Sequence, residues 1–242
     1  MKAKPGGPFR WVLRCWKFFC YGLGLGVLAV LCVQLWFFAH IVWWRMVEPG
    51  GTAFMEARLE QLRAENPGAK LAQHWVGYER ISPQLKRAVV AAEDAKFVGH
   101  EGFDWGAISK AIERNEKMGK LVAGASTISQ QLAKNLFLSG ERSWLRKGEE
   151  AAITWMLESM LSKRRILELY LNFAEWGEGV FGAEAAARYH FGVSATALNP
   201  QQAAFLAAIL PSPRRYGPGR ITPYVAGRIE TILARMPAAQ IP

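Results

Sequence analysis

Residues 124–135, GASTISQQLAKN, contain the clearest helix start in the chain. Thr127 and Gln130 stand three positions apart, which is the spacing of a capping box, and Gly124 precedes them. The pattern predicts a helix over 127–138 that begins abruptly, with free backbone N–H groups that suit a phosphate. A simpler interpretation also stays open, in which these polar residues form only a solvated helix face with a good cap.

Further helix starts follow this stretch and precede it. Ser82, Asn199 and Thr222 are each followed directly by proline, which pairs a capping side chain with a residue suited to the first helical position. Apolar residues recur with helical spacing over 104–117, 143–161, 163–172 and 182–190. Because alternating strand patterns are nearly absent, the sequence predicts one mostly α-helical domain over 71–242.

An apolar segment lies ahead of this domain. From Phe18 to Trp44 the chain has 27 residues without Asp, Glu, Lys or Arg, and about 20 residues of helix suffice to cross a hydrocarbon core. The run is too long for the apolar part of a signal peptide. We therefore predict an uncleaved transmembrane anchor over 18–44, followed over 45–70 by a linker or stalk with one short helix that Thr52 caps.

Charge predicts the orientation of this anchor. The tail over 1–17 holds five basic residues and no acidic one: Lys2, Lys4, Arg10, Arg14 and Lys17. The positive-inside rule places this tail in the cytoplasm and residues 45–242 outside it. No cysteine occurs in residues 45–242, which suits an exported domain. The tail carries half of the net charge of +10. The remaining positive charge is small and is explained by a nearby anionic membrane, so it does not indicate a nucleic-acid partner.

Carboxylates and cations are the groups left for chemistry. The four histidines lack a zinc-site spacing, and phosphate-binding loop and serine-elbow signatures are absent, so no metal site is predicted with certainty. Glu93 and Asp94 end an apolar helix, where desolvation makes a carboxylate more basic. Glu93, Phe97 and His100 have the spacing of one helix face. Alternatively, Glu93 is solvated, Phe97 belongs to the core and His100 caps a helix end.

A second carboxylate, Glu150, follows a basic run. Arg146 and Glu150 stand at i and i+4, and by themselves could form an ordinary surface ion pair. Together with Lys134 and Arg142, the run suits transfer of a sugar from a pyrophosphate, because a base deprotonates the hydroxyl while cations stabilise the departing diphosphate. A hydrolase instead needs a general acid, because a sugar alkoxide is a poor leaving group.

Four ordered motifs carry a family resemblance: Glu93-Asp94-x-x-Phe97-x-x-His100-x-Gly102, Gly124-x-Ser126-Thr127-Ile128-x-Gln130-Gln131-x-x-Lys134-Asn135, Arg146-Lys147-x-x-Glu150 and Ile166-Leu167-Glu168-x-Tyr170-Leu171-Asn172. In order and spacing they resemble the peptidoglycan glycosyltransferase family. The chain has no Ser-x-x-Lys transpeptidase motif, and Trp176 stands where bifunctional members carry tyrosine. It therefore resembles the monofunctional biosynthetic branch rather than the class A penicillin-binding proteins.

The resemblance implies a lysozyme-like glycosyltransferase domain, with a large helical lobe and a smaller jaw that dips into the membrane. Leu121, Leu136, Phe137 and Trp144 are candidates for apolar groups that enter the bilayer interface; alternatively, they are ordinary core residues. The implied reaction polymerises lipid II. Glu93 would be the general base on the acceptor GlcNAc 4-hydroxyl, which attacks the donor MurNAc anomeric carbon with inversion and expels undecaprenyl pyrophosphate.

The resemblance also implies roles for other residues. Glu150 would be the second essential carboxylate, which either orients the cations and the sugar or helps to hold a divalent ion. The donor's pyrophosphate and its cleft would be contacted by Lys134, Arg142, Ser126, Gln130, Gln131 and Arg146. No cofactor is obligatory, and a divalent cation (Mg²⁺ or Mn²⁺) at the pyrophosphate stays open.

Partners and location follow from the same resemblance. Expected partners are lipid II, the growing glycan chain, membrane lipid, and proteins of cell wall synthesis or division; nucleic acid is not expected. The catalytic domain would lie in the periplasm, anchored in the bacterial inner membrane. Two alternatives stay open: a lytic transglycosylase or lysozyme-like hydrolase that cuts glycan strands, and a catalytically silent membrane scaffold.

Overall fold

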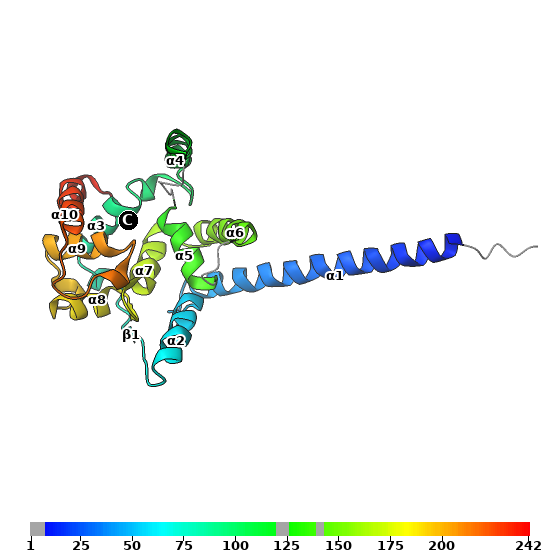
Figure 1. Ribbon diagram of the computed structural model, residues 1–242, viewed down its shortest axis with the longest axis horizontal. Coiled ribbons are helices and arrows are strands. Elements are labelled where there is room, and N and C mark those ends of the chain that lie inside the picture. The colour runs from blue at the N-terminus through cyan, green and yellow to red at the C-terminus, as the bar shows by residue number, and fades with distance from the viewer. Residues whose placement is uncertain (1–7, 120–125, 139–142) are drawn as a thin grey trace, which may run out of the picture. The chain divides into compact units, whose positions relative to one another are not determined.

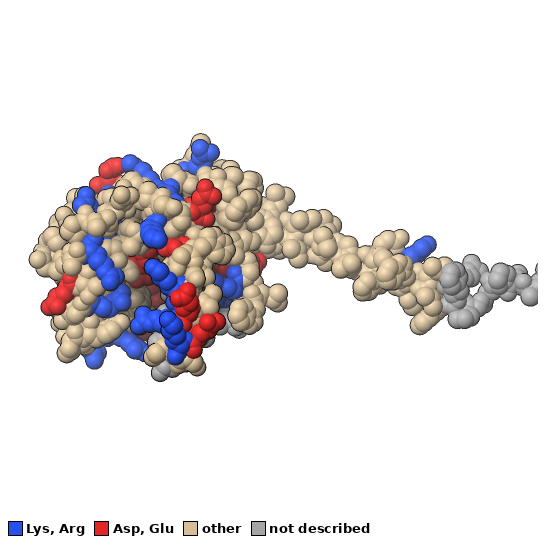
Figure 2. Space-filling model, turned by 90° about the horizontal axis from the view of Figure 1, so that it is seen from above, with Lys and Arg blue, Asp and Glu red and all other residues tan. Residues whose placement is uncertain are grey.

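The computed structural model describes residues 8–119, 126–138 and 143–242, and divides the chain into two compact units, residues 1–40 and 41–242 (Figure 1). Helix α1 (Pro8–Trp43) forms nearly all of the first unit. Within the described residues it is the one helix long and apolar enough to cross a membrane, over Trp11–Trp43. Charged atoms are sparse along it and dense on the second unit (Figure 2). The helix includes the predicted anchor almost entirely.

Helix α2 (Ala53–Glu65) corrects the interpretation of residues 45–70 as a linker or stalk. Thr52 caps it as predicted, because its Oγ1 accepts a hydrogen bond from the N–H of Met55 at 3.2 Å. However, α2 packs against α5, and Arg58 forms a buried ion pair with Glu175, 2.9 Å from Nε to Oε1. A segment that shares a buried ion pair with the domain is part of the domain.

Seven further helices build most of the second unit: α3 (Pro83–Glu93), α5 (Ile128–Phe137), α6 (Trp144–Met160), α7 (Lys163–Phe173), α8 (Ala183–Phe191), α9 (Pro200–Ile209) and α10 (Pro223–Arg235). Helix α3 packs against α9 and α10, and α5 packs against α6 and α7. In Figure 1 these two groups lie on opposite sides of the domain. Their buried faces form the apolar core.

The predicted helix starts are confirmed by their caps. The side chains of Ser82, Asn199 and Thr222 accept hydrogen bonds from backbone N–H groups at 3.2, 2.9 and 3.3 Å. In each case proline occupies the first turn of the helix that follows. These local signals therefore set where α3, α9 and α10 begin.

Strands are few and short, as the near absence of alternating patterns predicts. Strand β3 (Val180–Phe181) lies between β1 (Ala72–Gln73) and β2 (Glu175–Gly177), parallel to the first and antiparallel to the second. Trp176 within β2 is fully buried, and its indole Nε1 donates to the carbonyl of Leu206 at 3.1 Å. The small sheet thus fixes the turn after α7 against α9.

Helix α4 (Trp105–Met118) differs from the others, because none of its residues is buried. Asp104 caps it by accepting a hydrogen bond from the N–H of Ala107 at 2.9 Å. Trp105 and Ile112 on this helix are exposed, and in Figure 1 the helix stands at the edge of the domain. A helix with this placement fits the smaller jaw that the resemblance implies.

The apolar residues proposed for the membrane interface divide into different environments. Trp144 is 93% exposed, whereas Leu136 is 3% exposed, so the interface expectation is wrong for Leu136 and the core alternative is confirmed. Phe137 is half-buried, and its ring stacks on Trp44 with centroids 5.1 Å apart. Leu121 lies outside the described residues. Among the described members of this group, Trp144 is the one that is largely exposed at the surface.

Candidate active site

Glu93 is the last residue of α3. The chain then leaves the helix, since Asp94 has φ −158° and ψ 74°, and Phe97–Gly99 forms a separate short helical turn, η2. The predicted shared helix face of Glu93, Phe97 and His100 is therefore wrong, because the helical spacing stops at Glu93. The helix end leaves the Glu93 carboxylate at the wall of a cavity.

The surroundings of Glu93 make it more basic than an ordinary glutamate. Burial raises its pKa above the usual 4.5, and the charge of Asp94 acts in the same direction. A hydrogen bond from Gln131 and the positive charges of Arg228 and Lys134 oppose that rise. Gln131 donates from Nε2 to Glu93 Oε2 at 2.8 Å. A carboxylate whose pKa is raised by desolvation is suited to accept or donate a proton near neutral pH.

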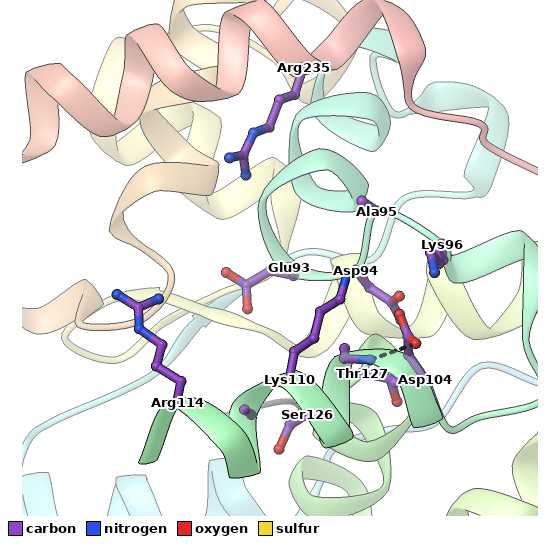
Figure 3. Close-up of a pocket in the computed structure, with 12 residues that line it drawn as sticks. Glu93, Asp94, Ala95, Lys96, Asp104, Lys110, Arg114, Ser126, Thr127 and Arg235 are labelled. Atoms are coloured by element: carbon purple, nitrogen blue, oxygen red, sulfur yellow. Dashed lines mark hydrogen bonds between the residues drawn. The ribbon is translucent and has the colours of Figure 1, made fainter. Parts of the chain in front are cut away.

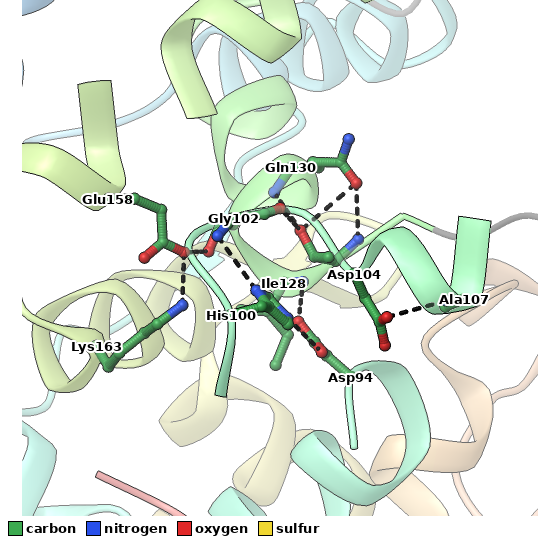
Figure 4. Close-up of polar contacts among 11 residues, drawn as sticks. Asp94, His100, Gly102, Asp104, Ala107, Ile128, Gln130, Glu158 and Lys163 are labelled. Carbon is green, nitrogen blue, oxygen red and sulfur yellow. Dashed lines mark hydrogen bonds and ion pairs between the residues drawn. The ribbon is translucent and has the colours of Figure 1, made fainter. Parts of the chain in front are cut away.

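Asp94, next to Glu93, is held in a different network (Figure 4). Its Oδ2 accepts a hydrogen bond from the N–H of Ile128 at 3.1 Å, and its Oδ1 lies 2.9 Å from His100 Nε2. The N–H of Gly102 donates to His100 Nδ1 at 3.2 Å, so Nε2 carries the proton that bonds Asp94. Asp94 therefore joins the end of α3 to the start of α5.

Gly102 lies where this network meets α6. The Thr127 hydroxyl donates to its carbonyl at 2.7 Å. Its φ of +87° favours glycine, and a Cβ there would lie 2.8 Å from Thr154 Cγ2 and 3.0 Å from Glu158 Cγ. Only glycine lets the backbone pass this close to α6 without displacing it.

The predicted capping box at the start of α5 is confirmed. Thr127 Oγ1 accepts from the N–H of Gln130 at 3.2 Å, and Gln130 Oε1 accepts from the N–H of Thr127 at 3.0 Å. Both residues are buried, so they do not form a solvated face. The N–H of Ile128 bonds Asp94 as well, so three N–H groups at this helix start already have partners, contrary to the expectation that they are free. The Gln130 amide oxygen serves the cap.

A cavity of about 680 Å³ opens beside Glu93 (Figure 3). It is lined by Glu93, Asp94, Ala95, Lys96, Asp104, Ala107, Lys110, Ala111, Arg114, Ser126, Thr127 and Arg235. Figure 3 shows Lys110 and Arg114 on α4 and Arg235 reaching from α10 on the other side. Four cations around one cavity suit a ligand that carries negative charge.

None of these four cations, Lys96, Lys110, Arg114 and Arg235, is among the site residues expected from the sequence. Their signal was weak, since Lys110 and Arg114 stand at i and i+4 like many pairs on a solvated helix. Arg235 lies in α10, more than 140 positions beyond Glu93 in the chain. Only the fold brings these residues together.

Glu150 lies in α6 and is 3% exposed. Its carboxylate pairs with Arg146, 3.3 Å from Nη1 to Oε2, and with Lys147 through Oε1. The predicted Arg146–Glu150 pair is confirmed, but its carboxylate is buried rather than at the surface. Glu150 is not among the residues that line the cavity.

Other expected site residues are placed unevenly. Ser126 lines the cavity, and Gln131 contacts Glu93. Lys134 is half-buried on α5, near enough for its charge to lower the pKa of Glu93. Arg142 lies outside the described residues. The structure thus brings Gln131 and Lys134 toward Glu93 and keeps Arg146 with Glu150.

A metal ion needs several carboxylate, imidazole or thiolate ligands close together. Among residues 8–119, 126–138 and 143–242, no three His, Cys, Asp or Glu side chains gather as a metal site. Both oxygens of Glu150 already contact cationic groups. This arrangement does not fit Glu150 as a ligand of a divalent ion.

Comparisons with known proteins identify the family of the chain. The family model described as Transglycosylase matches residues 60–237. The biosynthetic peptidoglycan transglycosylase of Methylobacillus flagellatus is 58% identical over 226 residues, which cover 93% of this chain and 99% of the relative. The proteins of the same name from Nitrosospira multiformis and Dechloromonas aromatica are 54% and 57% identical, over 96% and 90% of this chain and 98% and 95% of the relatives.

Proposed function

The chain belongs to the transglycosylase family, and we propose that it polymerises lipid II with Glu93 as the general base. The observation that carries this proposal is the position of Glu93, desolvated at the wall of a cavity lined by four cations. The lysozyme-like helical fold and the glycosyltransferase activity are those of the family.

The proposed reaction begins with a proton transfer. Glu93 removes the proton of the GlcNAc 4-hydroxyl of the acceptor lipid II as that oxygen attacks C1 of the donor MurNAc. The new β-1,4 bond forms as the bond from C1 to the pyrophosphate oxygen breaks, so the configuration at C1 inverts. Undecaprenyl pyrophosphate leaves with the electron pair. The raised pKa of Glu93 supports the role, because it brings proton affinity closer to working pH.

The cations support transfer rather than hydrolysis. Lys134, Arg142 and Arg146 are proposed to hold the donor's pyrophosphate, with Gln131 in the same cleft. Ser126 lines the cavity beside Glu93 and is proposed to lie between the donor and the acceptor. Lys96, Lys110, Arg114 and Arg235 line the cavity on the side of α4 and α10 and are proposed to hold the pyrophosphate of the acceptor. A glutamate with a raised pKa also suits a lytic enzyme, but water as acceptor would have no use for this second set of cations.

Glu150 is proposed to orient cations rather than to accept a proton. Its two oxygens engage Arg146 and Lys147, so it fixes the side chains that would meet the leaving diphosphate. No step of the proposed reaction requires a cofactor. A divalent ion that assists would bind mainly through the pyrophosphate oxygens, and Mg²⁺ or Mn²⁺ suits that position.

The location is proposed from charge and hydropathy. Helix α1 is long enough to span a bilayer, and five basic residues lie in its N-terminal tail. These features support a single-pass protein of the inner membrane, with residues 45–242 in the periplasm. The proposed partners are lipid II, the growing glycan, membrane lipid and other proteins of wall synthesis or division.

The test uses the full chain in detergent with labelled lipid II. We expect lysozyme-sensitive polymer from the wild type and no detectable polymer from Glu93→Gln over the same time. Glu101→Gln is the matched control, because it removes an exposed carboxylate from the same segment, and should polymerise as the wild type does.

Two results would replace the proposal. Release of fragments from preformed glycan, without polymer from lipid II, would indicate the lytic alternative. Inactivity of the wild type in both assays would favour a membrane scaffold, and polymer from Glu93→Gln at the wild-type rate would remove Glu93 as the base.

A further inference from the structure

A chain of two hydrogen bonds runs from the core to the proposed base. Tyr170, in α7, is 1% exposed, and its hydroxyl donates to Gln131 Oε1 at 2.9 Å. Gln131, in α5, donates from Nε2 to Glu93 Oε2 at 2.8 Å. The three residues thus link α7, α5 and the end of α3 in one line.

The direction of these bonds depends on how the Gln131 amide is turned. With Oε1 toward Tyr170, the amide presents its N–H donors to Glu93 and stabilises an ionised carboxylate. The reverse orientation would set Oε1 against the carboxylate, where two acceptors repel unless Glu93 is protonated. The amide orientation is therefore coupled to the protonation state of Glu93.

Tyr170 biases this choice because it remains a donor. Burial raises its pKa well above the ordinary 10.0, and the charges of Glu93 and Asp94 raise it further. The phenol therefore stays protonated throughout any practical assay. A phenol that donates in a buried place selects the amide oxygen as its partner, since leaving a buried donor unpaired is costly.

We propose that Tyr170 is a positioning residue for catalysis, which holds the Gln131 amide so that it always donates to the Glu93 carboxylate. The proposal rests on the assignment of Glu93 as the base. Two consequences follow: the carboxylate oxygen that Gln131 bonds is fixed, leaving Oε1 for the acceptor hydroxyl, and the ionised form of Glu93 persists to lower pH than burial alone would allow.

Other charged groups also face Glu93. They are Asp94 beside it, Lys134 on α5, Arg228 and Arg235 on α10, Lys110 and Arg114 on α4, and Lys96 after α3. All of these groups are the same in the wild type and in Tyr170→Phe. A change in the acidic limb when Tyr170 is altered would therefore report on Glu93 rather than on titration of these groups.

The test is a double-mutant cycle on the full chain, read as kcat/KM for lipid II against pH. Tyr170→Phe should move the acidic limb to higher pH and lower kcat/KM about tenfold on that limb, the effect of one hydrogen bond to a charged group. Gln131→Ala should do the same. Because both act through one amide, adding Tyr170→Phe to Gln131→Ala should change the profile little further.

Tyr78→Phe is the matched control. It also removes a tyrosine hydroxyl from the interior, one that donates to the carbonyl of Pro242 at 2.6 Å, yet it should leave the acidic limb where it is. The thermal midpoints of both variants show how much each change costs the fold.

Two outcomes would contradict the positioning role of Tyr170. In one, Tyr170→Phe lowers stability but leaves the acidic limb unmoved; in the other, the effects of Tyr170→Phe and Gln131→Ala simply add. Failure of the base assignment looks different, because Glu93→Gln would then keep the wild-type rate and its acidic limb.

Discussion

The sequence points to two glutamates, Glu93 at the end of α3 and Glu150 in the first turns of α6, and the structure places their carboxylates in different environments. Glu93 meets the amide of Gln131 at a cavity wall, and burial is the largest influence on its pKa. Glu150 contacts Arg146 and Lys147 with both of its oxygens. A desolvated carboxylate is a good proton acceptor, whereas one that is paired with two cations is a good anchor for them. Two carboxylates that the same resemblance points to therefore need not share one role.

The largest effect is expected from Glu93→Gln. Loss of a general base should lower the polymerisation rate about a thousandfold, while the thermal midpoint should rise. The rise follows because a carboxylate whose folded pKa lies above its unfolded pKa costs stability while ionised at neutral pH. Single-turnover assays with lipid II and thermal unfolding at pH 7.5 check both. A lower thermal midpoint in Glu93→Gln would contradict the proposed difference between Glu93 and Glu150.

Glu150→Gln should act in the other direction on stability. Arg146 would lose a partner in a place where its side chain is 19% exposed, while Lys147, at 44%, can turn to solvent. We expect a loss of about 1–3 kcal/mol in unfolding free energy, and a polymerisation rate about 30-fold lower, an effect of similar size in free energy. Urea unfolding and initial rates measure the two. An unchanged stability would mean that the cations do not depend on Glu150.

Gly102→Ala tests whether the two regions are held together. The new Cβ would lie 2.8 Å from Thr154 Cγ2 on α6, at a φ of +87°, so we expect a loss of about 2 kcal/mol in unfolding free energy. Gly148→Ala on α6 is the control. Nothing lies within 4 Å of its Cβ position, and alanine there should stabilise the helix by about 0.5–1 kcal/mol. Equal effects of the two changes would contradict the close approach.

The smallest expected effect lies away from both glutamates, at His190. Burial lowers its pKa below the ordinary 6.5, and its Nε2 bonds the Trp176 carbonyl at 2.7 Å. The unfolded chain therefore binds a proton first, so stability is complete above about pH 6.5 and falls as the pH drops below it. We expect the thermal midpoint to fall about 2 °C more from pH 7.5 to 5.5 in the wild type than in His190→Gln. Equal falls in the thermal midpoint would show that groups other than His190 dominate the pH dependence of stability. The same measurement defines the pH range in which activity profiles report on an intact fold.

Local signals account for most of the fold that the sequence predicts. Capping residues such as Ser82, Thr127 and Thr222 place helix starts correctly, because a cap is a contact between near neighbours. The stalk interpretation failed at Arg58, whose partner Glu175 is 117 positions away and leaves no local pattern. The shared face of Glu93 and His100 failed because the helix stops, and the sequence holds no marker as clear as glycine or proline at that point.

Less of the site than of the fold could be predicted from the sequence. Glu93, Glu150 and Gln131 stand in motifs, so a resemblance could nominate them. Arg235 could not be nominated in that way, since only the packing of α10 against α3 brings it to the cavity. Tyr170 stands in a motif too, but its bond to Gln131 crosses 39 positions and depends on how α5 packs against α7.

The most direct test of the contrast between the two glutamates is the pH dependence of kcat/KM for lipid II in the wild type, Glu150→Gln and Glu93→Gln. Because Glu93 must be ionised to act, activity should fall as the pH drops through its pKa, which lies above the usual 4.5. The account predicts that this acidic limb persists in Glu150→Gln at a lower rate and is absent from the residual activity of Glu93→Gln. A limb that survives in Glu93→Gln and disappears in Glu150→Gln would contradict it.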